Sequence, residues 1–129
     1  MSELERALAA PSSTRVNEWA TIVRRQVARL KTAFERHVAN AEADGGLFED
    51  VIDHEPRLVN RVERLRRDHG ALTTELAALA QRLNGAMATD TVATVREKGI
   101  ELPAHFAHHR YLGSELVYEA FNVDIEAAD

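Results

Sequence analysis

The sequence has 129 residues, the length of one ordinary domain, and its 45% hydrophobic content is enough to build a packed core. Its 16 basic and 21 acidic residues give a formal net charge of −5, so we expect neither nucleic acid nor a membrane among its partners. The absence of cysteine excludes disulfides, thiolate metal sites and cysteine nucleophiles. No apolar signal segment opens the sequence and no stretch is long enough to span a membrane, so we expect a cytoplasmic protein.

The first part of the sequence is expected to hold a leader and one long helix. Ala, Leu, Glu and Arg dominate the composition, which favours helix throughout. Pro11 and the hydroxyl residues at 12–14 separate a leader, residues 1–13, from the helical pattern that follows, and they offer N-caps for it. That pattern ends at Asp44-Gly45-Gly46, because glycine commonly stops a helix. The leader itself has room for another turn or two of helix.

Three further helical patterns follow: a short amphipathic one at 47–53, a long one at 57–83 and a second long one at 89–122. Pro56 separates the first two, since proline disfavours helix before it and suits the first turn after it. Pro103 lies inside the last pattern and predicts a kink or a restart. Short connections make neighbouring helices antiparallel. We therefore expect a single all-α domain over residues 1–129, an up-and-down helical bundle of three long helices with one short helix and an N-terminal segment.

Each long pattern carries an apolar stripe at alternating steps of three and four residues, and one histidine interrupts each stripe. These histidines are His37, His69 and His109. A buried imidazole must find partners for its ring nitrogens or it destabilises the core. Counted from Gly85, His69 lies about 24 Å and His109 nearly 30 Å along their helices, which places the two within about a turn of each other. The spacing therefore predicts a shared histidine layer, in which we expect all three rings to be buried.

Two interpretations of this layer remain open. In the first, the imidazoles converge from several helices to hold a metal or a cofactor, as they do in many helical bundles. In the second, each ring is an ordinary core histidine that bonds separately to a hydroxyl, a carbonyl or a water molecule.

The other three histidines have weaker links to the layer. In the segment HFAHHRY, His108 points roughly opposite the stripe and is expected in solvent. His105 lies at the edge of the stripe, one turn before His109, and could reach the same site. His54 follows the short amphipathic segment and is expected in a surface loop.

Carboxylates are scarce in the predicted layer. Glu42 and Asp68 lie at the edges of their stripes, close in sequence to His37 and His69. The positions one turn after the three histidines hold Ala41, Thr73 and Gly113, none of which is a strong metal ligand. The sequence thus supplies imidazoles to the layer without the carboxylates that bridge two metal ions.

Three segments of the sequence resemble the hemerythrin-like, or HHE cation-binding, family. They are FERHVANAEADGGLF, RLRRDHGALTTELAAL and FAHHRYLGSELVYEAFNVDI, and the resemblance covers about residues 16–126. In that family one helix ends with a histidine and acidic residues, another opens on an acid–histidine pair, and a last helix repeats the histidine–acid pattern. The resemblance implies a hemerythrin-like bundle that binds non-haem iron.

By this resemblance, His37, His69 and His109 fall on metal-ligand positions of the family. The family's acid four residues after the first histidine is Ala41 here, with Glu42 next to it, and its acid in the last helix falls near Gly113. A further histidine of the family's first helix has no counterpart, because residues 1–36 contain none. A full di-iron site is therefore not encoded in one chain, which argues against reversible oxygen carriage. The expected metal ligands are His37, Glu42, His69 and His109, around one iron ion or another divalent ion.

Three functions were weighed against this site. The first is a metal-binding bundle with a reduced ligand set, which acts in oxygen, nitric oxide or redox sensing or in metal handling. The second is a metal-free relative that acts as an interaction or regulatory module. An enzyme is not expected, because the sequence shows no nucleophile and no phosphate-binding glycine loop. A homodimer that shares helices between chains is a further expectation, since one family helix lacks its histidine.

Overall fold

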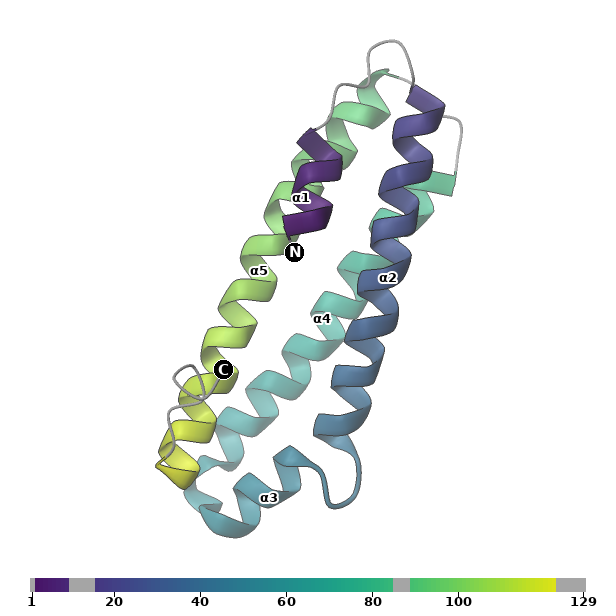
Figure 1. Ribbon diagram of the computed structural model, residues 1–129. Helices are drawn as coiled ribbons and strands as arrows, with labels where there is room; N and C mark the ends of the chain where they lie inside the picture. The colour runs from purple at the N-terminus through teal and green to yellow at the C-terminus, as the bar shows by residue number, and fades with distance from the viewer. Residues whose placement is uncertain (1, 10–15, 85–88, 123–129) are drawn as a thin grey trace.

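All secondary structure in the described part of the chain is helical, which confirms the predicted all-α class (Figure 1). The computed structural model describes residues 2–9, 16–84 and 89–122. Its elements are α1 (Ser2–Ala9), α2 (Val16–Glu42), α3 (Leu47–His54), the 3-10 helix η1 (Pro56–Leu58), α4 (Val59–Asn84) and α5 (Thr89–Phe121). Among the described helices, none is long and apolar enough to cross a membrane.

The helices end close to where the sequence predicts. After α2, Gly45 takes a positive φ of 73°, a conformation that favours glycine, and the chain turns into α3. Pro56 opens η1, which leads directly into α4. Asn122 follows α5 with a φ of 56°, and asparagine is one of the few side chains that tolerate this left-handed cap. The expected N-caps at 12–14 and Gly85 lie outside the described residues.

Of the kink or restart expected at Pro103, the restart does not occur, because α5 continues through this residue as one helix. Proline lacks the N–H that would bond to the carbonyl of Gly99, so the helix loses one hydrogen bond there. Leu102 and Pro103 are both buried. Packing of this face against the rest of the bundle therefore keeps the helix continuous across the missing bond.

The three long helices form an up-and-down arrangement in which α4 contacts both α2 and α5 (Figure 1). The two short helices lie at opposite ends of this arrangement, and each contacts both α2 and α5. At one end α1 lies between the two long helices, and at the other end α3 does. Short helices therefore occupy the two ends of the position that a fourth long helix would fill in a four-helix bundle.

The buried apolar side chains fall into two clusters, one toward each end of the bundle. The cluster beneath α1 includes Leu8, Trp19, Val27, Phe34, Leu72, Leu76, Leu83, Val95 and Leu102. The cluster beneath α3 consists of Ala41, Phe48, Val51, Leu58, Val62, Leu65, Leu116 and Ala120, with partly buried side chains packed against it. In each long helix the stripe histidine falls between the residues of these two clusters. The fold thus places the histidine layer at the boundary between two apolar cores.

The expected leader contains α1, which is docked onto the bundle. Leu4 and Leu8 are buried. The indole Nε1–H of Trp19 donates to the carbonyl of Ala7 at 3.0 Å, and the Nε–H of Arg96 donates to the carbonyl of Leu8 at 3.2 Å. These donors satisfy carbonyls that the last turn of a short helix leaves without a partner. The Arg96 guanidinium also lies 5.3 Å from the Trp19 ring centre, so Arg96 contacts both α1 and the tryptophan that bonds to α1.

Three glycines offer a direct test of how closely α1 packs. A Cβ at Gly99 would lie 2.3 Å from Leu8 Cδ1, whereas a Cβ at Gly70 or Gly113 would meet nothing within 4 Å. Alanine in a helix gains about 1 kcal/mol over glycine, while overpacking a core costs about 1–3 kcal/mol. We therefore expect Gly70→Ala and Gly113→Ala to raise the free energy of unfolding and Gly99→Ala to lower it, as measured by urea denaturation. Equal stabilisation by all three would show that α1 does not dock over Gly99.

Candidate metal centre

The structure brings His37 of α2, His69 of α4 and His109 of α5 together. One ring nitrogen from each lies within 4.8 Å of the other two. The ring centres of His69 and His109 are 4.9 Å apart, and that of His37 lies 5.1 Å from His69 and 5.5 Å from His109. Histidines 32 and 40 residues apart therefore share one layer, as the stripe positions predict.

Burial differs among the three histidines. His69 is 2% exposed and His109 is 6% exposed, as expected for residues in an apolar stripe. His37 is exposed, so the prediction that it lies in the core is wrong. The reason lies in the missing fourth long helix: α1 contacts α2 near Trp19, α3 packs near Ala41, and His37 lies on the stretch between them. The layer is thus closed on two sides and accessible beside His37.

A carboxylate fixes the orientation of the His109 ring. Asp68 Oδ2 lies 2.6 Å from His109 Nδ1. Because an ionised carboxylate only accepts hydrogen bonds, this contact assigns the proton to Nδ1 and leaves a lone pair on Nε2. His109 Nε2 in turn lies 3.3 Å from His37 Nε2. The lone pair of the neutral His109 ring therefore points toward the other histidines, where it can accept a hydrogen bond from the Nε2–H of His37 or bind a metal ion.

Among the residues that the structure describes, none makes a hydrogen bond to either nitrogen of the buried His69 ring. Glu42 Oε2 lies 3.4 Å from Nδ1, close enough for an ion pair but outside hydrogen-bond geometry. Buried polar atoms in folded proteins are almost always satisfied, because an unpaired one costs about 1–3 kcal/mol. Two unsatisfied nitrogens on one buried ring therefore point to a binding partner at this position.

Aromatic side chains enclose the layer. Phe34 contacts the rings of all three histidines, with ring centres 5.7–6.3 Å apart, and Phe48 of α3 stacks on His69 at 5.3 Å. Although His37 is exposed overall, its Nε2 faces His109 in the layer, and the partial desolvation there lowers its pKa; burial lowers the pKa of His69. The charge of a protonated His109 lowers both further, although Glu42 partly opposes this at His69. Both rings therefore favour the neutral form, which is the form that binds a metal ion.

His105 joins this centre through Asp68. Its Nε2 lies 2.6 Å from Asp68 Oδ1, and its Nδ1 lies 2.5 Å from Glu75 Oε2. Burial alone would lower the pKa of His105, but the bonds to Asp68 and Glu75 outweigh it and raise that pKa. Burial would likewise raise the pKa of Asp68, but hydrogen bonds from His105 and His109 outweigh it and lower that pKa. The two groups thus form a charged pair outside the three-histidine cluster.

The remaining candidates take different places. Glu42, expected as a metal ligand, lies behind the His69 ring and is not among the three mutually close donors. His108 is exposed as predicted, and His54 is also exposed, but as the last residue of α3 and not in a loop. The sequence interpretation missed Glu75, although it lies seven residues after Asp68 and so on the same face of α4.

The donor set suits one ion better than two. Metal–nitrogen bonds of about 2.0–2.1 Å place the ligating nitrogens of two imidazoles on one ion at most about 4.2 Å apart. The Nε2 atoms of His37 and His109, 3.3 Å apart, already meet this limit. Because all three ligand nitrogens lie within 4.8 Å of one another, the remaining pairs would have to approach by only a few tenths of an ångström. A second ion would need bridging carboxylates, but the positions one turn on hold Ala41 and Gly113. The site therefore fits a single metal ion.

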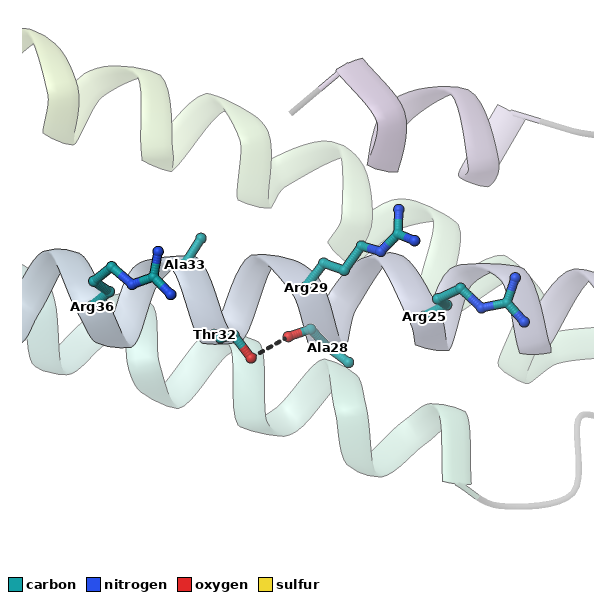
Figure 2. Close-up of a pocket in the computed structure, with 6 residues that line it drawn as sticks. All are labelled: Arg25, Ala28, Arg29, Thr32, Ala33 and Arg36. Atoms are coloured by element: carbon teal, nitrogen blue, oxygen red, sulfur yellow. Dashed lines mark hydrogen bonds between the residues drawn. The ribbon is translucent and has the colours of Figure 1, made fainter.

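A separate hollow lies on the outward side of α2 (Figure 2). It is a shallow groove of about 440 Å³ whose lining residues all come from this one helix. They are Arg25, Ala28, Arg29, Thr32, Ala33 and Arg36. Figure 2 shows the three arginines spaced along the helix, with Thr32 bonded to the carbonyl of Ala28. The groove contributes no metal-binding side chain.

No model of a protein family, no curated protein and no solved structure matches this chain. The hemerythrin-like relationship therefore stays a prediction from the sequence, and the function must be argued from the site itself.

The lowered pKa values of His37 and His69 predict an acid-sensitive fold. Below about pH 6.5 the unfolded chain takes up protons at these histidines that the folded chain does not, so the free energy of unfolding falls with falling pH. We expect this decline, measured on metal-free protein by urea denaturation between pH 7.5 and 5, to be smaller in His69→Leu. The raised pKa of His105 acts in the opposite sense, because its stabilisation is complete below its unfolded pKa and is lost as pH rises through the folded pKa.

Leu72→Ala, one turn further along the same face of α4, is the control, because it removes a fully buried side chain that does not titrate. It should lower stability by about 2–5 kcal/mol at every pH and leave the slope unchanged. A His69→Leu variant with the slope of the native protein would contradict the lowered pKa.

Proposed function

We propose that this chain is a hemerythrin-like metal-binding bundle that holds one ion, non-haem iron or another divalent transition metal, between His37, His69 and His109. One observation carries the proposal: His69 is buried beside donor nitrogens of two other histidines, and no residue in the described part of the chain bonds to either of its ring nitrogens. Three imidazoles from three helices match the ligand chemistry of iron, zinc, copper or nickel.

The open coordination sphere supports a sensing or metal-handling role. Three protein ligands leave at least one position on the ion for a small molecule. The exposed side of His37 offers that molecule a way in, while Phe34 and Phe48 close the other sides. Oxygen, nitric oxide or redox sensing and metal handling all use such a site.

A metal-free interaction or regulatory module is the second candidate. It is favoured by the 3.3 Å contact between His37 Nε2 and His109 Nε2, which is a sound hydrogen bond when one nitrogen is protonated. The contacts of Phe34 with the rings would likewise persist without metal. In this case, replacing all three histidines by leucine should be tolerated or should stabilise the fold.

Metal analysis of the untagged protein tests the proposal. After expression with iron supplementation, we expect about one equivalent of iron or zinc per chain. His69→Ala and His109→Ala should each abolish metal binding, because each removes one of only three ligands. His108→Ala is the matched control, since His108 is exposed on the same helix, and it should bind as the native protein does.

Less than about a tenth of an equivalent in the native protein would reject the metal-binding function in favour of the second candidate. Retention of metal by both His69→Ala and His109→Ala would show that the ion is held elsewhere.

A further inference from the structure

A divalent ion on three neutral imidazoles poses a problem of charge. The three neutral imidazoles carry no negative charge, so a divalent ion would add two uncompensated positive charges to a layer in which two of the three rings are buried. Burying an uncompensated charge is costly, and carboxylate ligands usually solve this in metal-binding bundles. Here Ala41 and Gly113 occupy the positions from which such ligands would come.

The structure places one carboxylate behind each of the two buried rings. Asp68 Oδ2 lies 2.6 Å from Nδ1 of His109, and Glu42 Oε2 lies 3.4 Å from Nδ1 of His69. Their two negative charges equal the charge of one divalent ion. The third ring, His37, is exposed, and within the described part of the chain no carboxylate pairs with it. A carboxylate therefore lies beside each of the two rings that are shielded from solvent.

Asp68 is itself held in place by groups nearer the surface. Its Oδ1 lies 2.6 Å from Nε2 of His105, whose Nδ1 lies 2.5 Å from Oε2 of Glu75. The carboxylate thus bridges two imidazoles, with one oxygen on each. This leaves it little freedom to turn away from His109.

Glu42 has a similar support. Its Oε1 accepts a hydrogen bond from Arg66 at 3.3 Å, and the Nε–H of the same guanidinium donates to Glu63 at 3.3 Å. Arg66 also lies over the Phe48 ring, which stacks on His69. Two chains of polar contacts therefore run inward from the surface, from Glu75 to His109 and from Glu63 to His69.

We infer that Asp68 and Glu42 are positioning residues that act on the metal through the imidazoles. Both supply charge that the ligands lack, and Asp68 also orients the His109 ring and fixes its proton on Nδ1, the outer nitrogen. This inference rests on the proposed metal-binding function. It also narrows the class of metal, because an all-imidazole inner sphere suits zinc, iron, copper and nickel far better than magnesium, calcium or manganese, which prefer oxygen ligands.

Zinc titration of the metal-free full-length protein tests the inference. We expect Asp68→Asn and Glu42→Gln each to weaken Zn²⁺ binding about 10–100-fold, as loss of such partners does at other sites. Both changes keep the shape of the side chain, and both residues are partly exposed, so the fold should persist in circular dichroism. Glu101→Gln is the control, because it removes one charge from an exposed residue of α5 that pairs with Lys98, and should leave the affinity unchanged.

The ¹⁵N chemical shifts of the imidazole nitrogens in metal-free protein give a second readout. In the native protein His109 should carry its proton on Nδ1, and in Asp68→Asn this preference should weaken. Unchanged zinc affinity in both variants, or an unchanged His109 tautomer in Asp68→Asn, overturns the inference. If the native protein binds no zinc or iron, the proposed function fails, and the compensation of charge fails with it. If the tautomer still depends on Asp68 in that case, Asp68 is confirmed as the residue that orients His109.

Discussion

The organisation of this bundle depends on one constraint: two imidazoles are buried in an otherwise apolar interior. A buried ring nitrogen without a partner is destabilising, so each such ring requires polar groups around it. Asp68 meets this need for His109, and through it the α4–α5 contact acquires a charged, directional bond within an apolar surface. His69 receives no such bond. The histidine layer consequently divides the interior into two apolar clusters and leaves one member that a ligand would satisfy.

The short helices determine which side of this layer is open. A continuous fourth helix would cover α2 along its whole length, whereas α1 and α3 cover the two ends. The exposure of His37 follows from this arrangement and gives the layer a buried side and an accessible side. Under the proposed function, an ion in this layer would have aromatic side chains on one side and an approach for a small molecule beside His37.

Periodicity predicted most of the fold, because apolar spacing and the residues that end helices are local signals. The three long helices, the short helix after Gly45 and the convergence of the histidines follow from them. The exposure of His37 did not follow, since it depends on how far α1 and α3 extend over α2. The sequence also left open a restart at Pro103, which does not occur, and did not predict the bridge from Asp68 to His105. Both depend on contacts between helices, which packing and side-chain rotamers determine and which residue spacing does not predict.

The scarcity of carboxylates in the layer has a different meaning once the side chains are placed. From the sequence, Ala41 and Gly113 argue that the site has lost its charge-balancing groups. In the structure, Asp68 and Glu42 lie one imidazole further out, where they can balance an ion without binding it. A bundle with nothing to bind would gain stability from apolar residues at His69 and His109, because replacing buried polar networks by well-packed apolar side chains is often neutral or stabilising. Keeping two buried rings, each backed by an anchored carboxylate, makes physical sense when a cation lies between them.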